Sequence, residues 1–218
     1  MYTLLIAVVT QGYNRYHRLL EALRYIKALA DKVSSYNGFK KPDIVVISKE
    51  DIYLDQYSSI QVIHLPDSNI PRARNHALRI ARSGGYDYLL FVDDDVLVNP
   101  DLVEQAVKCM RDNGRAGVVA SALYIHYGKE KPPIQPYTIK PVCVQVDSTH
   151  MGATLLDINM IPEDIWFNEE KEVGEDTDFC HRLGERGIAT LMVSGFYSIH
   201  WKLHHREYTL YYKSYTKK

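Results

Sequence analysis

Two groups of carboxylates in this chain could do chemistry, and the first is Asp93-Asp94-Asp95. It directly follows the apolar run 88–92, and ligands of open α/β sheets bind beyond the carboxyl ends of such strands. In an extended chain Asp93 and Asp95 project to the same side, where a cation would relieve their mutual repulsion. Hard oxygen ligands of this kind favour Mg²⁺ or Mn²⁺. The alternative is an acidic turn that caps the following helix.

The second group is Glu175-Asp176, which follows Gly174 at the start of a helix that we predict over 176–186. Acids in a first turn also stabilise the helix dipole, so a structural role stays open. The adjacent pair indicates acid–base catalysis, because one carboxylate can act as general base while its neighbour sets the pKa. We therefore predict Asp176 and Glu175 as catalytic residues.

Histidine is the third element, since His200, His204 and His205 follow the apolar run 189–193. A neutral imidazole is a good ligand for Mn²⁺ and can complete a site that carboxylates begin. His200 is the favoured ligand, although spacing separates it only weakly from the other two.

Short apolar runs that alternate with helix-spaced apolar residues must position these side chains. In the first half the predicted strands are 4–9, 43–47, 60–63 and 88–92, and the predicted helices are 19–33, 71–81 and 102–110. This alternation predicts an α/β fold with a mostly parallel, mixed sheet flanked by helices.

The alternation of strands and helices ends after Asn113-Gly114. Further along, four prolines within 128–141 predict a loop. The predicted elements that follow are strands at 116–124, 142–146, 151–158 and 189–193, and the helix at 176–186. We expect a single domain of two merged halves, 1–115 and 116–200. Tyrosines at helical spacing predict a docked helical tail at 201–218, with contact to a membrane surface as the alternative.

Composition narrows the class of protein. The chain has 218 residues, 46% of them apolar, which is enough for a sizeable core. Lys and Arg total 26 against 27 Asp and Glu, so the chain lacks the excess of positive charge that is typical of nucleic-acid-binding proteins. No apolar run reaches the ~18 residues of a spanning helix, and the first residues carry no pattern of a secretion signal. Cys109, Cys143 and Cys180 are odd in number and widely spaced, which predicts reduced thiols and a cytoplasmic protein.

Four segments together resemble a known family. They are TQGYNR at 10–15, IPRARNHAL at 70–78, YDYLLFVDDD at 86–95 and GEDTDFCHRL at 174–183. In this order they resemble the family-2-like nucleotide-sugar glycosyltransferases of the GT-A fold, over roughly 3–200. The resemblance implies a Rossmann-like half that binds the nucleotide sugar at 1–115 and an acceptor-binding, catalytic half at 116–200.

The resemblance also implies roles for the acids. Asp93 and Asp95 match the family's Asp-x-Asp motif, whose last acid binds Mn²⁺ or Mg²⁺ on the donor diphosphate. His200 matches the histidine that completes the metal site in several members. Asp176 matches the second acid of the Glu-Asp motif, which resembles the general base of inverting enzymes that use a hydroxyl acceptor.

Donor contacts follow from the same resemblance. The residues that it places near the nucleotide sugar, a UDP- or GDP-sugar, are Thr10, Asn14, Arg15, Arg74 and Asp94. The chain departs from the family after its second strand, where Asp-Asp-Gly-Ser is common and Ser48-Lys49-Glu50-Asp51 stands here. The base of the nucleotide is therefore left open.

We expect the acceptor, which is a glycan, lipid or protein hydroxyl, near the polar stretch 146–152 with His150 and Gly152. Trp166 is a candidate platform for a sugar ring, and a core position is its alternative. Two other functions stay open: an aspartate-nucleophile, HAD-like phosphohydrolase, suggested by Asp93-x-Asp95, and a non-catalytic module that binds nucleotides or glycans.

Overall fold

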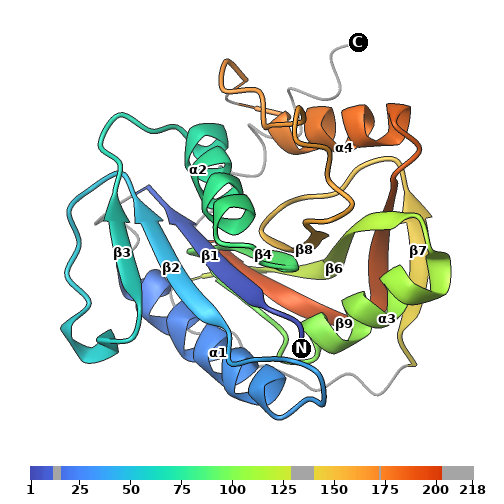
Figure 1. The fold of residues 1–218 in the computed structure, drawn as a ribbon. Helices are drawn as coiled ribbons and strands as arrows, with labels where there is room; N and C mark the ends of the chain where they lie inside the picture. Colours follow the sequence, from blue (N-terminus) through green and yellow to red (C-terminus); the bar gives the residue numbers. More distant parts are fainter. Residues whose placement is uncertain (12–15, 129–139, 172, 203–218) are drawn as a thin grey trace.

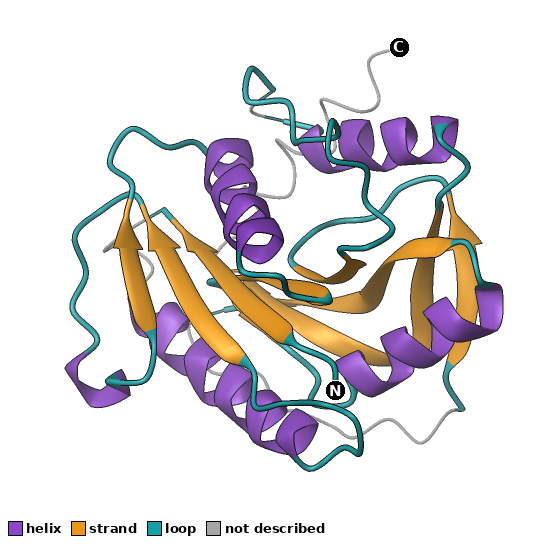
Figure 2. Ribbon diagram, viewed as in Figure 1, coloured by secondary structure: helices purple, strands orange, loops and turns teal. Residues whose placement is uncertain are grey.

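A computed structural model describes residues 1–11, 16–128, 140–171 and 173–202 as one mixed sheet with helices on both faces (Figures 1 and 2). The helices are α1 (Tyr16–Ser34), α2 (Ile70–Ser83), α3 (Leu102–Asn113) and α4 (Glu175–Glu185), with a short 3-10 helix at Asp55–Tyr57. Within the same residues the strands are β1 (Leu4–Thr10), β2 (Asp43–Ser48), β3 (Gln61–His64), β4 (Tyr88–Asp93), β5 (Val96–Leu97), β6 (Ala116–Tyr127), β7 (Val142–Val146), β8 (Ala153–Asp157) and β9 (Ala189–Lys202).

The strand order is β3-β2-β1-β4-β8-β6-β9-β5, and β7 pairs with β9. Strands β3, β2, β1 and β4 run parallel, as does the pair β6–β9, whereas β8, β5 and β7 join by antiparallel pairing. The mixed sheet is confirmed, and its parallel part is concentrated in the first half.

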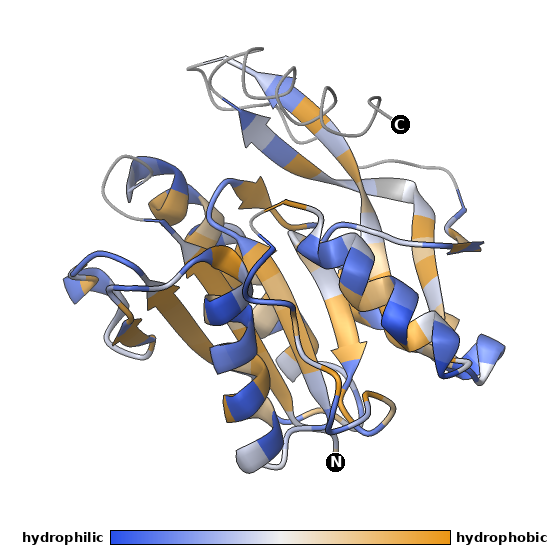
Figure 3. Ribbon diagram, turned by 90° about the horizontal axis from the view of Figure 1, so that it is seen from above, coloured by the Kyte–Doolittle hydropathy of each residue, from blue (hydrophilic) through white to orange (hydrophobic). Residues whose placement is uncertain are grey.

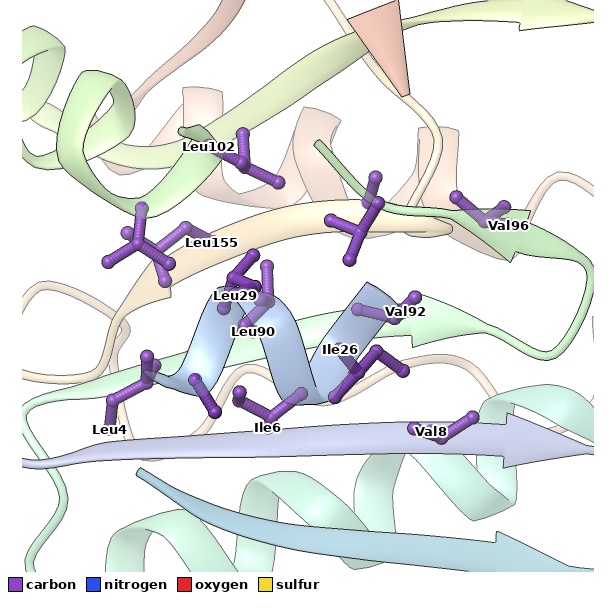
Figure 4. Packing of buried hydrophobic residues seen from close by; sticks show 14 of the residues in the cluster. Leu4, Ile6, Val8, Ile26, Leu29, Leu90, Val92, Val96, Leu102 and Leu155 are labelled. Atoms are coloured by element: carbon purple, nitrogen blue, oxygen red, sulfur yellow. The ribbon is translucent and has the colours of Figure 1, made fainter. Parts of the chain in front are cut away.

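Both faces of the central strands of the sheet are buried. Along β1, Leu4, Ile6 and Val8 pack in one cluster with α1 and α3 (Figure 4). The alternate residues Leu5 and Ala7 pack on the opposite face with α2 and α4. Because successive side chains of a strand point to opposite faces, a strand covered on both sides is a continuous apolar run. The helices turn polar residues outward over this core (Figure 3).

Residue chemistry sets the start of α2, the helix that carries Arg74. The Asn69 side chain accepts a hydrogen bond from the Arg72 backbone N–H at 3.0 Å, and Pro71 lies in the first turn, where its missing N–H costs nothing. Gly84 follows the helix. These signals set where α2 begins and ends, and its buried residues Ala73, Ala77 and Ala81 set the face that packs on the sheet.

The predicted strands and helices are confirmed within a few residues, with two additions. β5 is only two residues long, and β9 continues to Lys202 rather than ending near 193. The tail that we expected from 201 therefore begins inside a strand, and its residues 203–218 lie outside the described part of the chain. No helix in the described part has the length and apolar character needed to cross a membrane.

The prediction of reduced thiols is wrong for two of the three cysteines. Cys109 of α3 and Cys143 of β7 form a disulfide with their Cα atoms 5.8 Å apart, a separation usual for such bonds. Distance along the chain did not reveal it, because β7 folds back beside α3. Cys180 is free and buried. Disulfides are rare in the cytosol of most organisms, so the cytoplasmic prediction loses the support that it drew from reduced thiols.

Candidate active site

The acid triplet lies where β4 ends beside the end of β1. Thr10, the last residue of β1, donates its hydroxyl to Asp94 Oδ2 at 2.6 Å, and both residues are buried. Asp93 is the last residue of β4, and its backbone N–H donates to the Gly152 carbonyl at 3.0 Å. The turn then enters β5, which pairs with β9 so that Val96 lies opposite His200. This short pairing places the distant histidine beside the triplet.

One buried guanidinium joins the two acid groups. Arg74 of α2 lies with its Nη2 3.2 Å from Asp93 Oδ1 and its Nη1 2.9 Å from Glu175 Oε1, and it also bonds Asp176. Arg74 is only 2% exposed. Burial disfavours its charged form, but the carboxylates of Asp176, Asp93 and Glu175 outweigh this and raise the pKa of Arg74. The arginine that we placed near the nucleotide thus contacts both predicted motifs.

Asp176 has the protonation behaviour of a base that works near neutrality. Burial raises its pKa to about 7, and the charges of Glu175 and Asp93 add to this while Arg74 opposes it. The backbone N–H of Met151 donates to Asp176 Oδ2 at 3.0 Å and fixes the carboxylate. Perturbed acids of this kind gather at functional sites, and the role of general base stays a prediction for Asp176.

Asp95 and His200 form a pair that fits a divalent ion. Asp95 Oδ1 lies 3.2 Å from His200 Nε2, and two ligands at adjacent corners of an octahedral Mg²⁺ lie about 3 Å apart. The described residues hold no group of three or more metal-ligating side chains, and Asp93 faces Arg74 instead. Among the acids of the triplet, Asp95 is thus the one that His200 accompanies as a candidate ligand.

Arg18, which sequence reasoning missed, lies beside this pair. It belongs to the first turn of α1, is 3% exposed, and places Nη1 3.6 Å from Asp95 Oδ2. The same Nη1 donates to the Trp201 carbonyl at 3.1 Å. Nothing in the spacing of Arg18 on an apparently ordinary helix signalled this contact.

The predicted acceptor residues His150 and Gly152 lie against the acids. His150 Nε2 lies 2.9 Å from the Ser121 carbonyl oxygen, and burial lowers the pKa of the ring to about 4, so the ring is neutral at pH 7. Within the described residues His150 Nδ1 is buried without a hydrogen-bond partner. A Cβ at Gly152 would lie 2.7 Å from Asp93 Oδ2, so this position requires glycine for close packing.

Trp166 lies on the outer side of α2, where the ring packs under Arg82, with the guanidinium 4.3 Å from the ring centroid. It lines a pocket of about 680 Å³ together with Arg79, Asn75 and Arg182. This pocket contacts the outer side of the Glu-Asp helix rather than Asp176 itself.

A second pocket, of about 650 Å³, opens at the carboxyl ends of β1 and β2 and the start of α2. Gln11, Lys49, Asp67 and Arg72 are among its lining residues. Gln11 Nε2 is buried and has no hydrogen-bond partner within the described residues. Sequence reasoning passed over Gln11 and Lys49, although their positions directly after strands could have singled them out.

Four predicted or alternative site residues, Asn14, Arg15, His204 and His205, lie outside the described part of the chain. The structure brings the other predicted residues, except Trp166, to one end of the sheet. Thr10 and Asp94 bind each other, Asp95 lies beside His200, and the remaining acids surround Arg74.

The mixed sheet, flanked by helices and with acids gathered at its strand ends, agrees with the GT-A fold that the resemblance implied. Residues 7–161 match the family model described as Glycosyl transferase family 2, which covers most of the chain. The chain therefore belongs to glycosyl transferase family 2. A comparison with curated protein sequences found no significant match.

Solved structures show the same fold. TarS 1-349 of S. aureus in complex with UDP-GlcNAc aligns with a TM-score of 0.64 and 18% identity, over 94% of this chain and 59% of that one. GalNAc-T7 with UDP, GalNAc and Mn²⁺ aligns with a TM-score of 0.67 and 13% identity, over 94% and 45%. A197 from STIV aligns with a TM-score of 0.50 and 19% identity, over 91% and 84%. The chain thus spans 59% of the TarS fragment.

Proposed function

We propose that the protein is a divalent-metal-dependent, inverting glycosyltransferase that moves a sugar from a nucleotide-diphosphate sugar to a hydroxyl acceptor. One observation carries the proposal: Arg74 ties Asp93 at a strand end to Glu175 and Asp176 at a helix start. The Asp95–His200 pair adjoins this cluster through the acid triplet. A cation site and a base near neutrality are the parts that such a transfer needs.

The donor is a nucleotide-diphosphate sugar bound at the ends of β1 and β4. The pocket lined by Gln11 and Lys49 has a suitable size for a nucleoside. Asp95 and His200 would hold Mn²⁺ or Mg²⁺, which when bound supplies Lewis-acid stabilisation of charge on the leaving diphosphate. The UDP and Mn²⁺ that accompany GalNAc-T7 support this choice of partners.

Asp176 takes the proton of the acceptor hydroxyl. As the hydroxyl oxygen bonds to the anomeric carbon, the bond from that carbon to the diphosphate oxygen breaks on the opposite face, and the configuration inverts. Arg74 holds Asp176 in place and balances its negative charge before proton transfer. His150 is neutral at pH 7 and donates through Nε2 to the Ser121 carbonyl, so its Nδ1 can accept a hydrogen bond from the acceptor. The acceptor is a glycan, lipid or protein hydroxyl.

Family membership favours this function over the aspartate-nucleophile phosphohydrolase. A non-catalytic binding module is the remaining alternative, and turnover separates it from the enzyme. The cytoplasmic location stays a proposal, and the membrane contact of the tail is a proposal about residues that lie mostly outside the described part of the chain.

A thermal-shift panel tests the donor. UDP-, GDP- and dTDP-sugars are added with and without Mn²⁺, and a ligand at a hundred times its Kd stabilises the native state by about 2.7 kcal/mol. We expect one nucleotide series to raise the melting temperature, and to do so more with Mn²⁺. Absence of any shift across the panel would reject the proposal. Binding without release of nucleotide in the presence of acceptors would instead support the non-catalytic module.

A further inference from the structure

We propose that Arg18 makes tight metal binding at Asp95 and His200 depend on the donor diphosphate, an inference that rests on the proposed function. Arg18 is a buried cation at a position where a positive charge is unfavourable. Arg18 lies in the first turn of α1, which contains no acidic residue. A positive charge there opposes the helix dipole, and a guanidinium taken out of water needs a charged partner.

Asp95 supplies that partner with one of its two oxygens. Arg18 Nη1 lies 3.6 Å from Asp95 Oδ2, while His200 Nε2 lies 3.2 Å from Asp95 Oδ1. A divalent ion held between Asp95 and His200 would therefore sit on the far oxygen of a carboxylate that already faces a fixed positive charge. Like charges at this range repel, and burial of both groups weakens the screening.

Arg18 cannot turn away without losing other bonds. Its Nη1 also donates to the Trp201 carbonyl at 3.1 Å, and the Trp201 backbone N–H donates to the Asp95 carbonyl at 2.7 Å. The guanidinium is thus tied to the strand that carries His200 and to the turn that carries Asp95. Because Arg18 is held in this position, its positive charge would repel a divalent ion bound by Asp95 and His200.

The donor reverses this balance. A diphosphate brings negative charge that attracts both Arg18 and the ion, and it adds oxygen ligands that the protein does not supply within its described residues. Metal and nucleotide then raise each other's affinity by the same factor. Arg18 acts through Asp95 and the field around it, so it is a positioning residue.

The experiment measures Mn²⁺ binding by calorimetry, with and without saturating UDP, or GDP if the donor panel selects it. In the wild type we expect weak binding alone and much tighter binding with nucleotide. Arg18→Gln should tighten Mn²⁺ binding without nucleotide by about tenfold or more, and it should shrink the nucleotide effect. Arg18→Lys keeps the charge and should behave as the wild type does. Arg24→Gln is the matched control, because Arg24 lies on the same helix with its side chain 64% exposed.

Each result is decisive. If folded Arg18→Gln binds Mn²⁺ alone no more tightly than the wild type, the inference is overturned while the proposed function stands. If Arg18→Gln does not fold, Arg18→Met, which keeps an apolar stem and removes the charge, takes its place in the same titration, and unchanged Mn²⁺ affinity in that variant overturns the inference. If the wild type binds no Mn²⁺ even with nucleotide, metal dependence itself is rejected, and the inference with it.

Discussion

Replacement of Asp176 should slow the chemical step more than replacement of any other residue of the site. Asp176→Asn cannot accept a proton, so we expect kcat to fall by about 10²–10⁴ while donor affinity stays near the wild-type value. Because burial raises the pKa of Asp176 to about 7, the wild-type kcat/KM should rise with pH through about 7, and the variant should lose this rise. Initial rates of nucleotide release between pH 5 and 9, with donor binding measured separately, check both.

Asp178→Asn is the control, since Asp178 lies in the same first turn but pairs with Lys171 and Arg182. The contribution of Asp176 to the free energy of unfolding should fall with rising pH over the range in which kcat/KM rises. Because the native pKa of Asp176 lies above its ordinary 3.8, its contribution to stability is present below about pH 4 and is lost as the pH rises through about 7. An unchanged rate in Asp176→Asn would remove this residue from the role of base.

Gly152 packs against Asp93, and a methyl group should break that contact. In Gly152→Ala the new Cβ would lie 2.7 Å from Asp93 Oδ2, so the carboxylate must leave Arg74 or the loop must move. We expect a loss of about 1–3 kcal/mol in stability, as for overpacking in a core, and a marked loss of activity. Urea unfolding and rate measurements check this.

Gly184→Ala is the matched control, because nothing lies within 4 Å of a Cβ at that helical position. Alanine is the better helix former, so this variant should unfold no more easily than the wild type. Equal behaviour of the two variants would show that the packing at Gly152 is unimportant.

Sequence patterns identified the acids but not what they contact. Asp93 and Asp176 could be predicted because each follows a recognisable start or end of an element. Their meeting at Arg74, and the place of Arg18 beside Asp95, could not, because these pairs join residues from different elements. Side-chain contacts between distant segments leave no periodic trace in one sequence.

At the scale of elements, local periodicity was enough for the helices and the longer strands. Two-residue β5 was missed because two residues show no period, although its pairing with β9 decides where His200 lies. The antiparallel insertion of β8 between β4 and β6 was also missed, because strand order depends on long-range pairing that the apolar pattern does not encode.

The disulfide ties the edge strand β7 to α3, in addition to its ladder with β9. It pairs only with β9 in the described structure, and its valines Val142 and Val144 are exposed. Cys109 and Cys143 are 34 residues apart, so in the chain-entropy model reduction should lower the free energy of unfolding by about 4 kcal/mol. Unfolding in urea with and without a reductant measures this.

Cys180→Ser serves as control, because it removes the free thiol and keeps the disulfide. That variant should retain the full sensitivity to reductant, whereas Cys109→Ser should lose it. If the urea midpoint of the wild type is the same with and without reductant, the disulfide does not stabilise the protein.

At the scale of the whole molecule the two halves form one core. The cluster on the α1 face combines Leu4 and Leu90 of the first half with Leu155 and Leu191 of the second (Figure 4 shows the first three). A fragment of residues 1–115 lacks β8, the neighbour of β4, and exposes this surface. We expect no cooperative thermal unfolding of the fragment by circular dichroism, with the full chain as control. A sharp transition of the isolated fragment would mean that the halves are separate domains.

Because β5 pairs with β9, the candidate site can form only late in synthesis of the chain. The acids of the triplet leave the ribosome early, whereas His200 lies near the end of the last described strand. Since domains generally fold as units and the two halves share one core, the strands of the first half pack stably only after β8 and β9 have been made, and His200 reaches Asp95 at that late stage. Products of early termination would therefore carry the triplet but not the site that it completes.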